Sequence, residues 1–155
     1  MPHAIHTLSL DTILLFTQDK MKQLLDVLKL ETHVLEKNNI EELESITQEK
    51  IQLTEQIEKS EQRRIAFIAE KALDPNEPQQ WIKGEKLSTL WQKIKITSEQ
   101  CQKQNMINGL IINGSRRRIQ AQMNILNFAS PNNELVYSAT GTSVNPHSSK
   151  SLAHV

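Results

Sequence analysis

The stretch from Leu87 to Phe128 constrains the fold most, because its residues repeat at helical spacing along its whole length. Alternating steps of four and three residues place a first set on one helix face, namely Ile94, Ser98, Cys101, Asn105, Asn108, Ile112, Ser115, Ile119, Gln122 and Leu126. A second set lies beside it, namely Ile107, Ile111, Gly114, Arg118, Ala121, Ile125 and Phe128. One seam packs on a neighbouring helix, so the second, more apolar seam predicts a further packing partner.

Two more helical stretches precede this one. From Leu8 to about Glu36, apolar residues recur at every seventh position, namely Leu14, Met21, Leu28 and Leu35. Asn38–Asn39 interrupts the pattern, and asparagine tolerates the left-handed conformation that ends helices. The seam of the next helix carries the charged Lys50 and Arg64 and the polar Ser60 among apolar residues. We expect both charged residues at the edge of the seam, with their charged ends in water.

The segment Asp74–Pro78 contains two prolines, which break a helix. A short helical piece is expected to carry Trp81 before the third long helix begins near Glu85. The sequence therefore predicts an all-α fold: an antiparallel, coiled-coil-like bundle of three long helices at about 8–36, 40–72 and 85–128. These helices form a single domain, 1–128, and the Ser-, Asn- and Thr-rich segment 129–155 is predicted to be a flexible, disordered tail.

Composition excludes several classes of function. Eighteen basic and eighteen acidic residues cancel, so the chain lacks the basic excess of a nucleic-acid binder. Neither a signal peptide nor an apolar run long enough for membrane insertion is evident, which predicts a cytoplasmic protein. The single Cys101 excludes an internal disulfide. We interpret it as a small apolar seam residue in preference to a reactive thiol.

No catalytic or cofactor-binding motif is present, so we predict that the protein is not an enzyme and has no cofactor. The five histidines are scattered, and the pair His3 and His6 is interpreted as chance spacing, not a metal site. Arg116–Arg118 is the one concentrated charge. We favour a basic patch that complements the dipole of a helix C-terminus and pairs with a neighbouring carboxylate, over contact with RNA or lipid.

The motifs resemble those of the FlgN-type flagellar export chaperones. The entry Asn38–Leu43, followed by Lys50 and Leu53, is similar to the opening of the family's second helix. The third helix carries the residues of the family's main motif in the same order, namely Leu90, Trp91, Cys101, Asn105, Asn108 and Gly109. Tyr137 to Gly141 is similar to the family's tail motif, with Ser138 in place of the usual Asp.

This resemblance implies a helical bundle without a cofactor that binds the hook–filament junction proteins FlgK and FlgL in the cytosol. It implies protection of their C-terminal segments and delivery to the cytosolic domain of the flagellar export gate. Within the family the tail tyrosine is associated with gate docking, and we transfer that role to Tyr137 alone. The residues themselves allow an incidental tail aromatic equally well.

We expect the client to dock helix-in-groove on the second seam of the third helix and its neighbours. The candidate client-binding residues are Met106, Ile107, Leu110, Ile111, Ala121, Met123, Ile125 and Phe128. Ordinary burial inside the bundle explains the same seam. Asn105 and Asn108 are interpreted first as polar residues that fix helix register, and Gly109 as a site of close helix approach. The alternative function is a non-enzymatic coiled-coil adaptor or structural protein that self-associates through the same face.

Overall fold

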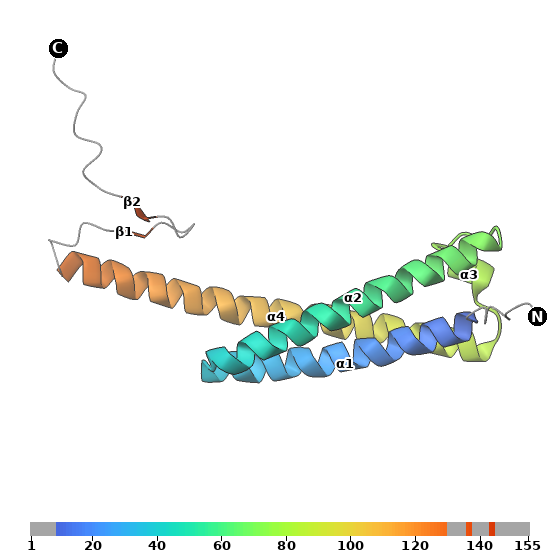
Figure 1. The fold of residues 1–155 in the computed structure, drawn as a ribbon, viewed down its shortest axis with the longest axis horizontal. Coiled ribbons are helices and arrows are strands. Elements are labelled where there is room, and N and C mark those ends of the chain that lie inside the picture. Colours follow the sequence, from blue (N-terminus) through green and yellow to red (C-terminus); the bar gives the residue numbers. More distant parts are fainter. Residues whose placement is uncertain (1–8, 130–135, 138–142, 145–155) are drawn as a thin grey trace, which may run out of the picture. The chain divides into compact units, whose positions relative to one another are not determined.

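The computed structural model describes residues 9–129 and two short strands at 136–137 and 143–144. For Phe128, Ala129 and the strand residues it describes the backbone alone. The described fold is almost entirely helical (Figure 1), with elements α1 (Leu10–Lys37), α2 (Ile40–Glu70), α3 (Pro78–Trp81), α4 (Glu85–Ala129), β1 (Val136–Tyr137) and β2 (Ser143–Val144). The chain divides into two compact units, 1–112 and 113–155. The single domain predicted for residues 1–128 stays a prediction.

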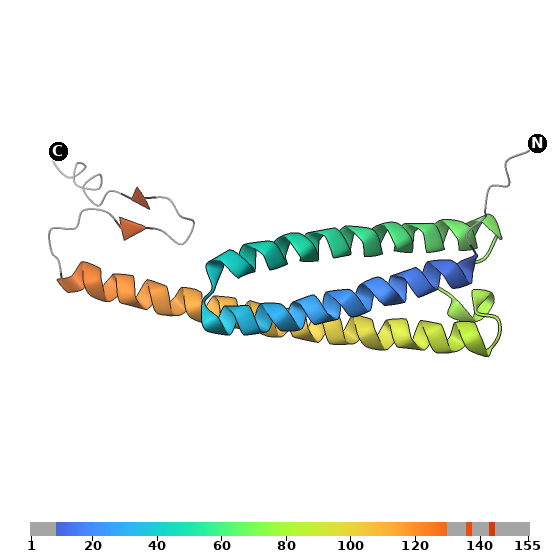
Figure 2. The ribbon, with the colours of Figure 1, turned by 60° about the horizontal axis from the view of Figure 1, so that its bottom comes forward.

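Helices α1 and α2 form a hairpin in the first unit, and Figures 1 and 2 show them side by side along their lengths. Ser9 caps α1 by accepting a hydrogen bond from the Thr12 amide. Asn38 ends α1 in the left-handed conformation, with φ 54° and ψ 35°, as the sequence predicted. The Asn39 side chain then caps α2 by accepting from the Glu42 amide. Two consecutive asparagines thus supply both ends of the turn.

The first part of α4 packs against this hairpin. Its buried seam consists of Leu90, Ile94, Thr97, Cys101 and Asn108. The prediction that Asn105 and Ile112 belong to this seam is wrong, because both are exposed, Ile112 by 40%. Cys101 and Asn108 are buried as predicted, whereas Thr97, Gln104 and Ile111 replace the predicted Ser98, Asn105 and Ile112 on the packed side. The shift occurs because Thr97, in place of Ser98, faces α1, where its hydroxyl accepts a hydrogen bond from Gln18.

The core alternates between apolar and polar layers. One apolar cluster comprises Leu10, Leu14, Ile68, Trp81, Leu90 and Ile94. The next layer is polar: the hydroxyls of Thr17 and Ser60 lie 2.7 Å apart, and Gln18 Nε2 donates to Thr97 Oγ1 at 3.3 Å. A second apolar cluster follows, comprising Val27, Val34, Ile46 and Leu53. The buried hydroxyls and amide find side-chain hydrogen-bond partners only in the polar layer. A helix that slid by one turn would therefore lose these partners.

Arg64 closes the end of the hairpin at which α2 meets α3. Its guanidinium carbon lies 5.1 Å from the ring centre of Trp81 and 5.0 Å from that of Trp91. It also donates to both carboxylate oxygens of Glu61 and, at 3.2 Å, to the Pro75 carbonyl. The prediction that its charged end lies in water is therefore wrong. Two tryptophans and a carboxylate replace the water around this cation.

The tail contains a strand pair that the sequence did not predict. Val136 pairs with Val144 and Tyr137 with Ser143, in antiparallel register. Valine and tyrosine favour extended backbone, which accounts for strands at these positions. The remaining predictions for residues 130–135, 138–142 and 145–155 lie outside the described residues. None of the described helices includes a stretch long and apolar enough to cross a membrane.

Replacing Arg64 by alanine should lower the free energy of unfolding by about 2 kcal/mol, because the change removes buried hydrogen bonds and two cation–π contacts. Urea unfolding followed by circular dichroism measures this loss. Arg63→Ala is the matched control, since Arg63 is exposed and one residue away, and it should change the unfolding free energy by less than about 0.5 kcal/mol. Equal effects of the two substitutions would contradict the role assigned to Arg64.

Candidate functional site

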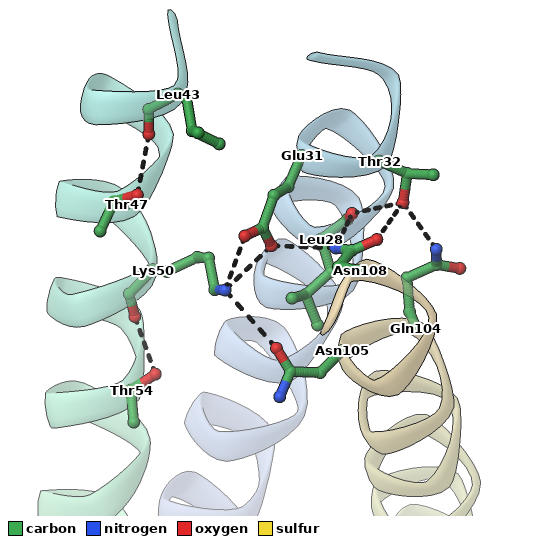
Figure 3. Close-up of polar contacts among 10 residues, drawn as sticks. All are labelled: Leu28, Glu31, Thr32, Leu43, Thr47, Lys50, Thr54, Gln104, Asn105 and Asn108. Carbon is green, nitrogen blue, oxygen red and sulfur yellow. Dashed lines mark hydrogen bonds and ion pairs between the residues drawn. The ribbon is translucent and has the colours of Figure 1, made fainter. Parts of the chain in front are cut away.

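A buried ion pair joins α1 to α2 in the half of the hairpin nearest the Asn38–Asn39 turn (Figure 3). Lys50 Nζ donates to both oxygens of Glu31, at 3.0 and 2.9 Å. Glu31 is only 4% exposed, whereas Lys50 keeps part of its side chain in water. The prediction that the Lys50 head lies in water is therefore wrong. A carboxylate so deeply buried needs several donors to offset its lost hydration.

Asn108 of α4 supplies another of these donors. Its Nδ2 donates to Glu31 Oε2 and to the Leu28 carbonyl, both at 2.9 Å. Its Oδ1 accepts from Thr32 Oγ1, which in turn accepts from Gln104 Nε2 at 2.7 Å. Asn108 is 1% exposed, and these contacts use its amide on both sides. They favour the interpretation of Asn108 as a residue that fixes the register of α4 on α1.

Asn105 lies one turn earlier and behaves differently. It is exposed, and its only hydrogen bond in the described part of the chain is a long one, accepted from Lys50 Nζ at 3.5 Å. The two asparagines of the motif therefore have unequal roles. Asn108 is locked into the network, whereas the Asn105 amide remains largely available to solvent.

The other residues of the third-helix motif are structural in the first unit. Leu90 is in the apolar core, and Trp91 packs edge-to-face on Trp81 with ring centres 4.9 Å apart. Cys101 is buried and donates its S–H to the Met21 carbonyl. Burial raises the pKa of this thiol, an effect that the positive charge of Lys29 only partly opposes. A thiol with a raised pKa is a poor nucleophile at neutral pH, in agreement with a seam role.

Gly109 does not serve close helix approach as predicted. A Cβ atom built at Gly109 or Gly114 meets nothing within 4 Å. Nor does either glycine interrupt the helix, since α4 runs without a break from Glu85 to Ala129. Neither packing nor a bend in the described residues requires these glycines.

Exposed apolar side chains appear on α4 near the end of the first unit. Met106 and Leu110 are strongly exposed, and Ile107 is exposed by 36%. Ile111, which the sequence grouped with them, is half-buried and continues the packed seam. Of the four candidate client-binding residues in this unit, three are accessible and one is partly used within the fold.

In the second unit every described side chain from Arg116 to Leu126 is exposed. The large apolar ones are Ile119 (57%), Met123 (36%), Ile125 (68%) and Leu126 (65%). Ala121 is exposed as well, while the side chains of the remaining two candidates, Phe128 and Tyr137, lie outside the described residues. An uninterrupted run of exposed residues with four large apolar members is unusual for a soluble helix without a partner.

Sequence reasoning missed Ile119 and Leu126 as candidate binding residues, because it assigned them to the seam packed inside the bundle. The spacing of Ile119, Met123 and Leu126 by four and three residues places them on one helix face. The positions seven and fourteen residues after the buried Asn108 share its helix face, and both are polar, namely Ser115 and Gln122. The apolar face of residues 113–126 is therefore offset by one residue from the face that packs in 85–112.

The arginine triplet does not complement a helix C-terminus. Helix α4 ends at Ala129 and has no basic residue in its last turn, whereas the dipole acts only within that turn. Within the described part of the chain, no carboxylate lies within ion-pair distance of Arg116, Arg117 or Arg118. The expected neighbouring acid is thus missing there too. No group of three or more metal-ligating side chains occurs among the residues that the structure describes.

The model of the family described as FlgN protein matches residues 9–145, which include the hairpin, all of α4 and both strands. Searches among curated proteins and among solved structures returned no significant match.

Substituting Asn108 by leucine should lower the free energy of unfolding by about 2 kcal/mol, because the buried Glu31 carboxylate loses a donor and Thr32 loses its amide partner. Asn105→Leu is the control one turn away on the same helix and should shift the unfolding free energy by no more than about 0.5 kcal/mol. Chemical denaturation measures both. An unchanged stability for Asn108→Leu would show that the network does not fix the register.

Proposed function

Because this chain belongs to the FlgN family of flagellar export chaperones, we propose that it binds the C-terminal helical segments of the hook–filament junction proteins FlgK and FlgL. In this proposal it acts in the cytoplasm, prevents premature assembly of its clients and delivers them to the cytosolic domain of the export gate. It does so without catalysis or a cofactor. We also propose that the three long helices act as an antiparallel, coiled-coil-like bundle in which α4 presents the client-binding face.

The observation that carries the proposal is the exposed apolar face of Ile119, Met123 and Leu126. An amphipathic helix buries such a face when it packs alongside in ridge-and-groove fashion. Methionine suits a surface that receives more than one client, because its flexible thioether adapts to different partner shapes. Of the residues predicted to bind the client, Met106, Ile107, Leu110, Ala121, Met123 and Ile125 are exposed.

The energetics require a contact longer than one apolar cluster. Burying Ile119, Met123 and Leu126 contributes roughly 4.5–9 kcal/mol, at about 1.5–3 kcal/mol for each side chain. Association itself costs an estimated 4–15 kcal/mol, or roughly the same amount. Met106 and Leu110, also predicted to bind the client, lie on another face of α4 by helical spacing. We therefore propose that they contact a second segment of the client, not the helix seated on Ile119, Met123 and Leu126.

Tyr137 is proposed as the residue that docks on the export gate. Support comes from the family's tail motif and from the extended backbone of Val136–Tyr137, since extended segments present alternate side chains to a partner. This role is separate in sequence from the client-binding face on α4. Client capture and gate docking are therefore expected to fail independently.

The double substitution of Ile119 and Leu126 by aspartate should weaken capture of FlgK and FlgL C-terminal fragments by at least about a hundredfold, because two apolar contacts are replaced by charges that must be desolvated. Isothermal titration calorimetry measures the affinity. Since both residues are exposed, the melting temperature should stay within a few degrees of wild type.

Gln120→Asp combined with Asn124→Asp is the control, because it adds the same charge on a different face of the helix. Equal loss of affinity in both double variants would contradict the assigned face. Light scattering on the free protein tests the adaptor alternative. A dimer that becomes monomeric only in the Ile119→Asp, Leu126→Asp variant would favour self-association.

Tyr137→Ala should reduce binding to the isolated cytosolic domain of the export gate by at least about tenfold, the usual effect of removing an aromatic anchor. Binding to the junction-protein fragments should remain within about twofold of wild type. Tyr137→Phe retains the ring and should retain most of the gate affinity. If both partners were lost together, the separation of the two roles would be wrong.

A further inference from the structure

Two arginines flank the apolar face of the second unit. Arg118 directly precedes Ile119 and Arg116 lies three residues before it, so the two side chains project on opposite sides of Ile119, at about 100° and about 60° around the helix. Ile119 and Leu126 are separated by seven residues, which makes them equivalent positions of a heptad. Arg116 and Arg118 therefore lie on opposite flanks of the face formed by Ile119, Met123 and Leu126, where long side chains can reach a helix that packs on this face.

The chain supplies no opposite charge for these side chains locally. From Gln100 to Ala129 the sequence contains Lys103 and three arginines but no Asp or Glu. Elsewhere the structure pairs its inward-facing cations, as with Lys50 on Glu31 and Arg64 on Glu61. Arg116 and Arg118 are exposed beside exposed isoleucine and leucine, with no ion pair in the described part of the chain. Basic edges around an apolar centre are complementary to an acidic amphipathic helix.

We propose that the segment seated on Ile119, Met123 and Leu126 is an acidic amphipathic helix whose carboxylates lie at the edges of its apolar seam, facing Arg116 and Arg118. This inference rests on the proposed function and adds the charge of the occupant to it. A second copy of the same segment cannot satisfy the arginines, because it contains no carboxylate. Basic helices are rejected by repulsion at the same two edges, so the arginines supply selectivity among apolar helices.

The test uses the full-length protein and three labelled helical peptides of four heptads. All three share one apolar seam, and their edge positions are all Glu, all Gln or all Lys. At low salt the Glu peptide should bind about tenfold tighter than the Lys peptide, with the Gln peptide between them, because attraction at two edges is exchanged for repulsion. Raising the salt should reduce this ratio, since the edges remain in contact with solvent. Fluorescence anisotropy measures each affinity.

Neighbouring variants of equal charge make the test specific for position. Arg116→Glu and Arg118→Glu should each reduce the preference for the Glu peptide, and the double variant should reverse it in favour of the Lys peptide. Arg117→Glu changes the net charge equally but projects away from Ile119, and it should leave the preference within about twofold of wild type.

Equal affinities for the three peptides would overturn the inference while leaving an apolar docking face intact. An equal loss from Arg117→Glu would also overturn it, since the charge would then act without regard to position. Binding of a single-stranded RNA of twenty nucleotides, abolished alike by all three single variants and unaccompanied by a peptide preference, would assign the arginines to nucleic acid instead. Failure of every peptide to bind would overturn the inference, and capture of the junction-protein fragments would then decide the proposed function separately.

Discussion

Burial of the Glu31 carboxylate is the constraint on which the arrangement of the first unit depends. A charge removed from water is tolerated only where donors surround it, and here the donors come from two other helices, Lys50 on α2 and Asn108 on α4. All three helices must therefore meet at one register before the carboxylate is satisfied. That register determines which side chains of α4 are buried up to Ile112 and which, such as Met106 and Leu110, remain exposed.

Much of this architecture could be predicted from the sequence, because heptads, caps and prolines act locally. Three features agree with the sequence pattern, namely the asparagine turn, the short helix carrying Trp81 and the start of α4 at Glu85. The phase of α4 could not be predicted. Between Ile94 and Ile107 the candidate seam positions are mostly polar in either phase, so hydrophobic periodicity does not distinguish the two phases. Hydrogen bonds to α1 determine which of these positions are buried. Ile119 and Leu126 were assigned to the wrong face for that reason.

The surroundings of the charged residues could not be predicted from the sequence either. Arg64 was expected in water, yet it lies between Trp81 and Trp91, which are distant in sequence and become neighbours only in the fold. Arg116–Arg118 was expected to pair with a neighbouring acid, yet none is within ion-pair distance in the described part of the chain. A cation's environment depends on tertiary contacts that periodicity does not encode. Membership of the family indicates the general role, whereas the exposed side chains indicate which surfaces deserve testing.

The division of the hairpin core into two apolar clusters has a consequence for motion. The polar layer of Thr17, Gln18, Ser60 and Thr97 joins the helices by hydrogen bonds between the two clusters, which share no residue. Because the apolar packing of one cluster does not continue into the other, we infer that the end of the hairpin beside the Asn38–Asn39 turn can open locally while the end that contains the tryptophans stays folded. Local opening at one end of the hairpin would then leave the helices at the other end packed.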